Sequence, residues 1–184
     1  MLKVGITGNI ASGKSIVESL IKDKNYLVFD LDIISHKLLS ENEEIKKAIL
    51  DEFKTLNRGD IGKIVFSDFE KRKKLEEIIH PKLKEFCMRI FNGSEKIVFI
   101  SGALLYEAGF DKLFDKIIYI DAKKEIRLER LMKRNNLSKE DALLRIESQL
   151  DNKNKADFIV ENNDSIEKLE IKVNSILREL TCKL

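Results

Sequence analysis

The sequence is short of several residue types and features that define whole classes of protein. It has no tryptophan, one proline and two cysteines, and 34 basic residues nearly balance 32 acidic ones, leaving a net charge of +2. Cys87 and Cys182 lie far apart in no metal-like spacing, which predicts free thiols in a reducing compartment, with Cys87 buried. The charge balance gives no reason to expect a nucleic-acid partner.

Long apolar runs are also missing, and none is long enough to span a membrane. The amino end enters a predicted strand at once and lacks the charged start and long apolar run of a signal peptide. We therefore expect a cytoplasmic protein with no membrane contact and no obligate protein partner. With 184 residues, 43% of them apolar and 36% charged, the chain suits one folded α/β domain.

One stretch near the amino end carries the strongest chemical signal. Residues 8–15 match G-x-x-x-x-G-K-S, the pattern of a phosphate-binding P-loop. In this pattern backbone N–H groups surround phosphate oxygens, Lys14 reaches the β- and γ-phosphates, and the Ser15 hydroxyl holds Mg²⁺. The predicted nucleotide-binding residues here are Gly8, Asn9, Ile10, Ala11, Ser12, Gly13, Lys14, Ser15 and Ile16.

The flanks of this loop decide between a P-loop and an ordinary glycine-rich turn. Residues 2–7 alternate apolar side chains as a strand does, and the apolar positions of residues 16–21 fit one face of a helix. Strand, loop and helix are the context that the P-loop requires.

Further apolar runs predict a mostly parallel sheet whose strands are separated by helices. The predicted strands cover residues 26–29, 96–100, 116–120 and 158–160. Asp30 and Asp32 follow the first of these, and strand alternation would put both on one side at the edge where open α/β sheets bind ligands. The alternative for either carboxylate is a turn or helix-capping role.

The remaining patterns predict helices over residues 33–53, 71–92, 123–134, 138–150 and 164–180. Residues 57–60 are expected to form a loop, and Pro81 should kink or restart the second helix. Arg127, Arg130 and Arg134 share a helix face. That face is either simply solvated or part of a mobile hairpin that encloses phosphates.

Two classes of P-loop protein compete at this point. A GTPase-type switch needs D-x-x-G after a strand and N-K-x-D for the guanine base. Residues 154–157 spell N-K-x-D, but they precede an apolar run instead of following a strand, and no Asp has Gly three places later. A small-molecule kinase explains more, because Asp32 can orient an acceptor hydroxyl and arginines can neutralise the transferred phosphoryl group.

The chain resembles the dephospho-CoA kinase family from the P-loop to near Asn163. The resemblance rests on ordered segments: Val28-Phe29-Asp30-Leu31-Asp32 (D-x-D), Leu75-Glu76-Glu77-Ile78-Ile79-His80-Pro81 (L-E-x-I-x-H-P), Leu104-Leu105-Tyr106-Glu107 (L-L-F-E), 130–138 with Arg145 and Gln149, and Ala156-Asp157 with Asn162. The departures are Ser101-Gly102-Ala103, where the family has D-x-P, Arg127 in place of a frequent Gln, Ile16 in place of Thr, and a short connection from Gln149 to Ala156.

The resemblance implies a P-loop kinase fold, an α/β fold with a five-stranded parallel sheet of order 2-3-1-4-5. It implies a core of about residues 1–32, 93–122 and 151–184, a helical acceptor lobe of about 33–92 and a lid of about 123–150. The implied reaction transfers the γ-phosphate of ATP, with Mg²⁺, to the ribose 3′-hydroxyl of dephospho-CoA. A nucleoside monophosphate kinase is the alternative, although Arg58 and Arg72 are the only arginines before Arg89 to hold an acceptor phosphate.

The implied site residues complete the prediction. Asp32 is the catalytic base, and Lys14, Arg130 and Arg134 stabilise the transferred group. Arg134 and Asn162 add to the nucleotide site, and the acceptor contacts are Asp32, His80, Leu104, Glu107 and Arg130.

Overall fold

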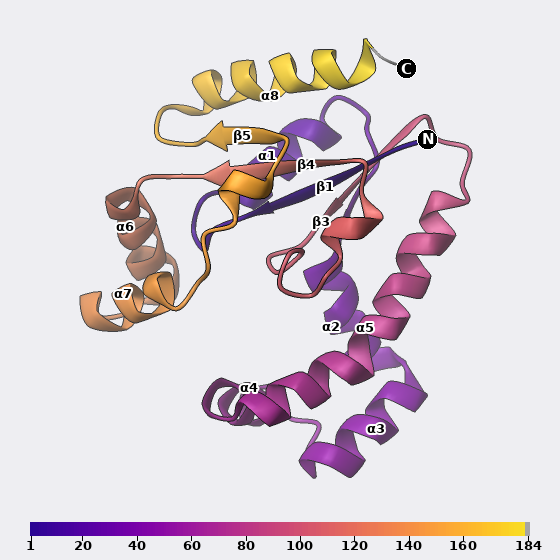
Figure 1. Ribbon diagram of the computed structural model, residues 1–184. Coiled ribbons are helices and arrows are strands. Elements are labelled where there is room, and N and C mark those ends of the chain that lie inside the picture. Colours follow the sequence, from indigo (N-terminus) through magenta and orange to yellow (C-terminus); the bar gives the residue numbers. More distant parts are fainter. Residues whose placement is uncertain (183–184) are drawn as a thin grey trace. The chain divides into compact units, whose positions relative to one another are not determined.

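The computed structural model describes residues 1–182 and contains a five-stranded parallel sheet of order β2-β3-β1-β4-β5 (Figure 1). The strands are β1 (Leu2–Gly8), β2 (Val28–Asp30), β3 (Ile97–Ser101), β4 (Lys116–Asp121) and β5 (Phe158–Glu161). Register follows the buried apolar positions, so Val4 of β1 lies opposite Phe99 of β3. The fold and strand order expected from the sequence are therefore confirmed. The last two residues of the predicted core segment 151–184 lie outside the described residues.

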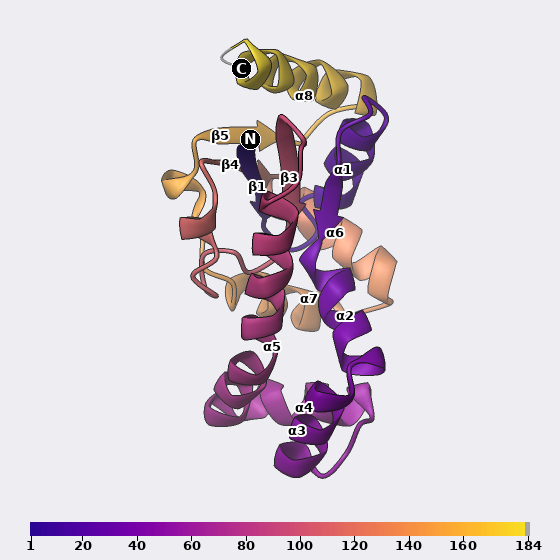
Figure 2. The ribbon, with the colours of Figure 1, turned by 90° about the vertical axis from the view of Figure 1, so that its right-hand side faces the viewer.

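Two helices cover one face of this sheet, as Figure 2 shows from the side. They are α1 (Lys14–Lys22) and α8 (Ile166–Thr181). Alternate strand residues such as Ile6, Phe99 and Ile120 are fully buried against apolar side chains of both helices, including Val17 and Leu169. Burying each such side chain contributes about 1.5–3 kcal/mol. This layer therefore fixes the start of α1, and with it the loop that precedes α1.

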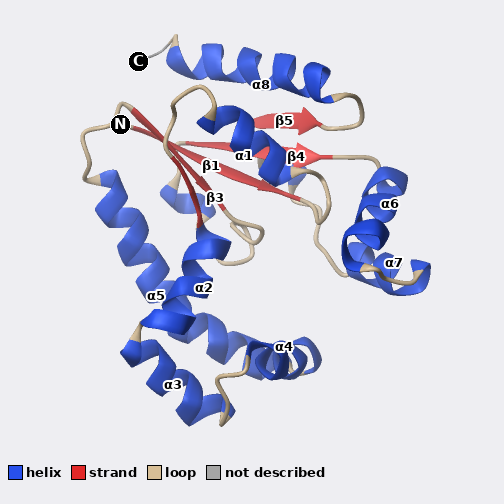
Figure 3. Ribbon diagram, turned by 180° about the vertical axis from the view of Figure 1, so that it is seen from behind, coloured by secondary structure: helices blue, strands red, loops and turns tan. Residues whose placement is uncertain are grey.

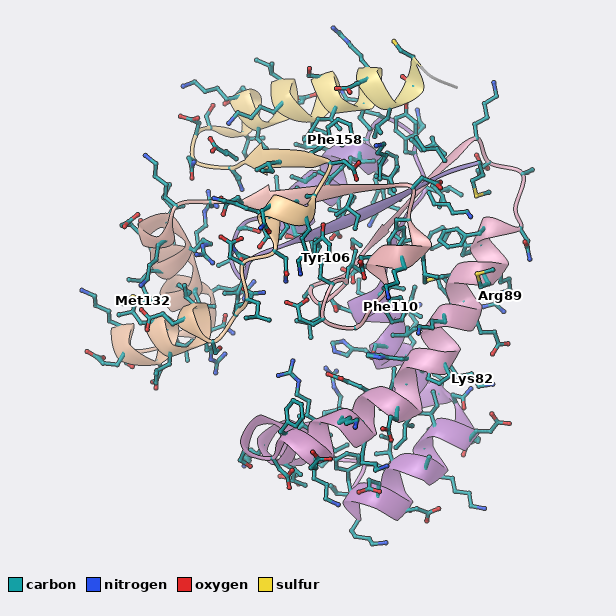
Figure 4. All side chains as sticks on the ribbon, viewed as in Figure 1. Lys82, Arg89, Tyr106, Phe110, Met132 and Phe158 are labelled. Carbon is teal, nitrogen blue, oxygen red and sulfur yellow. The ribbon has the colours of Figure 1, made fainter. Side chains whose placement is uncertain are left out.

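The opposite face of β1 is covered by the connection between β3 and β4. This connection contains the 3₁₀ turn η1 (Asp111–Leu113). A Cβ atom at Gly5 would lie 2.9 Å from the Phe114 ring and 3.2 Å from Leu105, so only glycine leaves room for these side chains. Figure 4 shows Tyr106 and Phe110 of the same connection, and Phe110 is buried.

The chain divides into two compact units, residues 1–29 with 94–184 and residues 30–93. The first contains the sheet. The second is all helical, as the blue ribbons of Figure 3 show, and consists of α2 (Leu31–Glu41), α3 (Glu43–Phe53), α4 (Arg58–Ser67) and α5 (Phe69–Phe91). Its own core includes Ile45, Ile49, Phe53 and Ile61.

Two predictions in the helical unit are wrong in detail. The pattern over residues 33–53 predicted one helix, but Asn42 adopts an extended conformation and its side chain accepts a hydrogen bond from the Ile45 N–H, which starts α3. The expected loop at 57–60 is largely helical, because Asn57 caps α4 through the N–H groups of Gly59 and Asp60. In both cases an asparagine side chain caps the helix and sets where it begins, which the apolar pattern alone did not predict.

Pro81 lies inside α5, which is continuous from Phe69 to Phe91. Its ring nitrogen has no hydrogen to donate to the carbonyl of Glu77, so one helical hydrogen bond is lost. The ribbon of α5 changes direction partway along its length in Figure 1, which agrees with the kink expected from the sequence.

Candidate active site

The P-loop connects β1 to α1 through two residues in the left-handed backbone region. Ala11 has φ 60° and Gly13 has φ 97°. This curl presents the first N–H groups of α1, which have no partner within a helix, at the carboxyl edge of the sheet. A Cβ atom at Gly13 would overlap the Asn162 amide, and one at Gly8 would overlap the Ile120 carbonyl, so the two glycines of the motif are sterically required.

Lys14 is the first residue of α1, and its ammonium group lies between this helix and β3. Its Nζ donates a hydrogen bond to Glu18 Oε1 at 2.8 Å and another to Ser101 Oγ at 3.2 Å. Glu18 and Ser101 are buried, with 5% and 0% of their surface exposed. Lys14 was predicted from the sequence to bind phosphate, and Ser101 was identified only as a departure from the family pattern. Glu18 was given no role, although its spacing of four residues from Lys14 would have indicated a contact between them.

Arg130 and Asn162, two predicted site residues from distant parts of the chain, meet at the P-loop. Arg130 belongs to α6 (Lys124–Asn135), and Asn162 follows β5. Arg130 donates from Nη1 to the Ser12 carbonyl at 3.3 Å and from Nη2 to the Asn162 carbonyl at 3.2 Å. Asn162 Nδ2 donates to the same Ser12 carbonyl at 2.8 Å. The guanidinium is thereby fixed beside the loop that the motif assigns to phosphate.

The helical hairpin of α6 and α7 (Lys139–Glu147) also packs against the P-loop. Leu131, Ala142 and Ile146 form its core, with Ile10 and Ala11 of the P-loop against them. Figure 4 labels Met132, which packs against the same cluster. Ser138 caps the start of α7, because its hydroxyl accepts from the Asp141 N–H and donates to the Asp141 carboxylate.

Two further hydrogen bonds hold the P-loop, one from the segment after the hairpin and one from β4. The Gln149 Oε1 accepts a hydrogen bond from the Ile10 N–H at 2.6 Å. The Tyr119 hydroxyl donates to Asn9 Oδ1 at 2.8 Å, and burial together with the nearby Asp151 carboxylate raises the pKa of this phenol. The phenol therefore stays protonated and remains a donor at neutral pH.

Three other predicted site residues belong to this unit, and two of them form hydrogen bonds with residues outside the P-loop. The Arg134 side chain is exposed and donates to Asn135 Oδ1 at 2.9 Å, at the end of α6. Leu104 is exposed in the turn after β3. Glu107 accepts from Asn152 Nδ2 at 3.1 Å, which joins this turn to the segment before β5.

The helical unit separates the roles of Asp30 and Asp32. Asp30 is the N-cap of α2, and its Oδ1 accepts from the Asp32 N–H at 2.7 Å and the Ile33 N–H at 3.3 Å. Asp32 lies in the first helical turn with an exposed side chain. Strand alternation was therefore the wrong basis for placing the two carboxylates together, since the strand ends at Asp30. The capping role belongs to Asp30.

His80, the other site residue predicted in the helical unit, is half-buried on α5. Burial lowers the pKa of its imidazole, with a smaller lowering from Lys84 and an opposing effect of Glu76. The ring therefore favours the neutral form, which can both donate and accept a hydrogen bond.

The N-K-x-D sequence at residues 154–157 has a structural role. The Asp157 carboxylate accepts from Lys116 Nζ at 2.6 Å and from the Ile117 N–H at 2.8 Å. These contacts join the amino ends of β4 and β5, whereas Asn162 lies past the carboxyl end of β5. Asp157 is thus at the other end of the strand from the P-loop, and the match to a guanine-binding motif is accidental.

A metal ion at this edge would find few protein ligands. Within residues 1–182 no group of three or more His, Cys, Asp or Glu side chains is arranged to hold an ion. Ser15 is exposed in the first turn of α1, next to Lys14. A single hydroxyl beside a phosphate site fits Mg²⁺, which keeps several waters and takes its remaining ligands from phosphates.

The described helices include none with the length and hydropathy to cross a membrane.

The parallel sheet, the P-loop with its lysine, and an arginine brought to that loop by a helical hairpin define a P-loop kinase. Comparison with known proteins is more specific. The sequence profile of the family described as dephospho-CoA kinase matches residues 2–168. The dephospho-CoA kinase of Listeria monocytogenes is 40% identical over 95% of each chain.

Solved structures agree with this assignment. A Thermus thermophilus protein superposes with a TM-score of 0.82 and 33% identity over 97% of each chain. The dephospho-CoA kinase of Campylobacter jejuni has a TM-score of 0.70 and 31% identity, covering 97% of this chain and 96% of its own. The chain belongs to the dephospho-CoA kinase family.

Proposed function

We propose that the protein transfers the γ-phosphoryl group of ATP to the ribose 3′-hydroxyl of dephospho-CoA, giving coenzyme A and ADP. The observation that carries this proposal is the meeting of Lys14, Arg130 and Asn162 around the P-loop of a chain that belongs to this family. Two cations at one anion site suit the charge that spreads over a transferred phosphoryl group.

On the donor side, residues 8–16 surround the phosphates of ATP and Lys14 contacts the β- and γ-phosphates. Asn162 and Arg134 contribute to the nucleotide site, and Arg130 neutralises charge on the transferred group. Mg²⁺, when bound, would be held through Ser15 and would neutralise part of the phosphate charge.

On the acceptor side, Asp32 orients the 3′-hydroxyl and takes its proton as the oxygen bonds to the γ-phosphorus and the bond to ADP breaks. His80, Leu104, Glu107 and Arg130 contact dephospho-CoA. Residues 33–92 then form the acceptor lobe, and residues 123–150 form a lid that excludes water from the reacting group.

A coupled assay of ADP production tests the function directly. Purified protein is given ATP and Mg²⁺ with dephospho-CoA, AMP, CMP, shikimate or no acceptor, and the product from dephospho-CoA is identified by mass spectrometry. Turnover is expected with dephospho-CoA, and Lys14→Ala should reduce it by on the order of a hundredfold or more. Preferred turnover of AMP or CMP would instead favour a nucleoside monophosphate kinase, and no turnover of dephospho-CoA by the folded protein would refute the proposal.

A further inference from the structure

Glu18 is a buried carboxylate in the second turn of α1, next to the proposed phosphate site. Only 5% of its surface is exposed, and Lys14 Nζ donates to its Oε1 at 2.8 Å. Glutamate is almost never this buried unless it is paired. The neighbouring positions on this face, Val17 and Ile21, carry the apolar side chains that an ordinary sheet-covering helix uses.

The direction of this side chain brings its charge toward the P-loop. Side chains on an α-helix tilt toward the helix amino end, so the Glu18 carboxylate extends back over the turn that begins with Lys14. A negative charge beside a polyphosphate site is unfavourable by itself. Its presence there calls for a compensating role, and the ammonium that it holds is the group that the motif assigns to phosphate.

Ser101 fixes the second side of the same ammonium. It is the last residue of β3, fully buried, with its Oγ 3.2 Å from Lys14 Nζ. The ammonium is therefore held between a carboxylate on α1 and a hydroxyl on β3.

We propose that Glu18 is a positioning residue that holds the Lys14 ammonium against the end of β3 in the geometry needed for phosphoryl transfer. The inference deepens the proposed function, since it concerns the same site, but it depends only on the ATP side of the reaction. A lysine held in advance loses less conformational entropy when the phosphoryl group moves.

The test is a set of steady-state measurements on Glu18→Ala, Glu18→Gln and the double variant Glu18→Ala/Ser101→Asp. Glu18→Ala should lower kcat by about tenfold to a hundredfold, because misplacing a reacting group by an ångström has effects of this size. The KM for ATP should stay within about threefold, since the positioned lysine acts mainly in the transition state. Aspartate at position 101 should restore at least about tenfold of the lost kcat, because it returns a carboxylate to the ammonium.

Glu170→Gln is the matched control, because it removes an ion pair of 2.8 Å between α8 and Lys24, beyond the far end of α1. It should retain the kcat of the unmodified protein. If Glu18→Ala does not fold, Glu18→Gln, which keeps the shape and an acceptor but loses the charge, is compared with Glu18→Gln/Ser101→Asp. Unchanged kcat in the folded single variant, or no recovery in the double variant, would overturn the inference.

The proposed function and this inference can fail separately. The unmodified protein is assayed first, and if it uses a different acceptor, the same variants are compared with that acceptor. A change of acceptor leaves the expected loss and recovery intact, because Lys14 acts on ATP.

Discussion

Single side chains at this site differ in function even when they are close in sequence. Asp30 accepts two backbone N–H groups at the start of α2, so its carboxylate is a structural cap. Asp32 lies in the first turn of the same helix with an exposed side chain, and the cap of that helix is Asp30. This division makes the catalytic proposal for Asp32 separable from the stability of α2.

Replacing Asp32 with asparagine should reduce turnover of dephospho-CoA by roughly a hundredfold to ten-thousandfold, because asparagine cannot take the proton of the acceptor hydroxyl. The melting temperature should barely change. Asp30→Ala should instead lower the stability of the protein, by about 1 kcal/mol, because the cap of α2 is lost. Thermal unfolding and the coupled assay measure both effects, and a fully active Asp32→Asn variant would remove the assignment.

His80 should make the stability of the protein depend on pH in a specific window. Burial lowers the pKa of its imidazole below the ordinary 6.5. Below about that pH the unfolded chain therefore binds more protons than the folded one, and the free energy of unfolding falls as the pH falls. Above it, both states are neutral and His80 adds no slope.

The His80→Gln variant should accordingly lose less stability than the unmodified protein between about pH 6.5 and pH 5, by at most about 1.4 kcal/mol per pH unit. Urea unfolding followed by circular dichroism at several pH values gives the two slopes. Parallel slopes throughout that range would show that burial does not favour the neutral ring.

At the scale of elements, the α6–α7 hairpin is attached to the P-loop by both polar and apolar contacts. Arg130 reaches the Ser12 carbonyl, Gln149 accepts from the Ile10 N–H, and Ile10 and Ala11 pack on the hairpin core. Any rearrangement of the P-loop around phosphates must therefore change its contacts with the hairpin. This coupling is the physical content of the proposed lid.

Binding of a non-hydrolysable ATP analogue together with dephospho-CoA should slow hydrogen exchange of the backbone amides in α6 and α7, and Arg130→Ala should weaken that protection. Exchange in α8, which packs on the sheet away from the hairpin, serves as the internal reference. Equal exchange of the hairpin with and without saturating ligands would contradict the lid.

At the scale of the whole molecule, the two cysteines differ in exposure and therefore in the reactivity expected of each thiol. Cys87 of α5 is fully buried, and burial raises the pKa of its thiol to about 11, whereas Cys182 is exposed. A buried, protonated thiol is a poor nucleophile. Its modification therefore requires the helical unit to open.

In a Cys182→Ser variant, Cys87 should react with a thiol reagent such as Ellman's reagent at least about a hundredfold more slowly in native buffer than in concentrated urea, since buried core segments open rarely. Timing the absorbance change gives both rates. Rapid labelling under native conditions would mean that the helical unit opens locally and that its core is less stable than its packing indicates.

The sequence alone determined the features that depend on short stretches of chain. The P-loop, the strands around it and the kink at Pro81 all follow from side-chain periodicity and from the backbone preferences of glycine and proline. The order of the sheet was obtained only through the family resemblance, because strand periodicity carries no information about which strands are neighbours.

Tertiary structure decided which distant side chains meet. Arg130, Asn162 and Ser12 come from segments separated by up to 150 positions, and Glu18 gains meaning only when β3 places Ser101 beside the same lysine. It also decided between competing local signals, since Asp30 rather than Asp32 became the cap and Asp157 was bound by Lys116 away from the P-loop. These outcomes depend on packing energies summed over the whole core, and a local pattern cannot contain them.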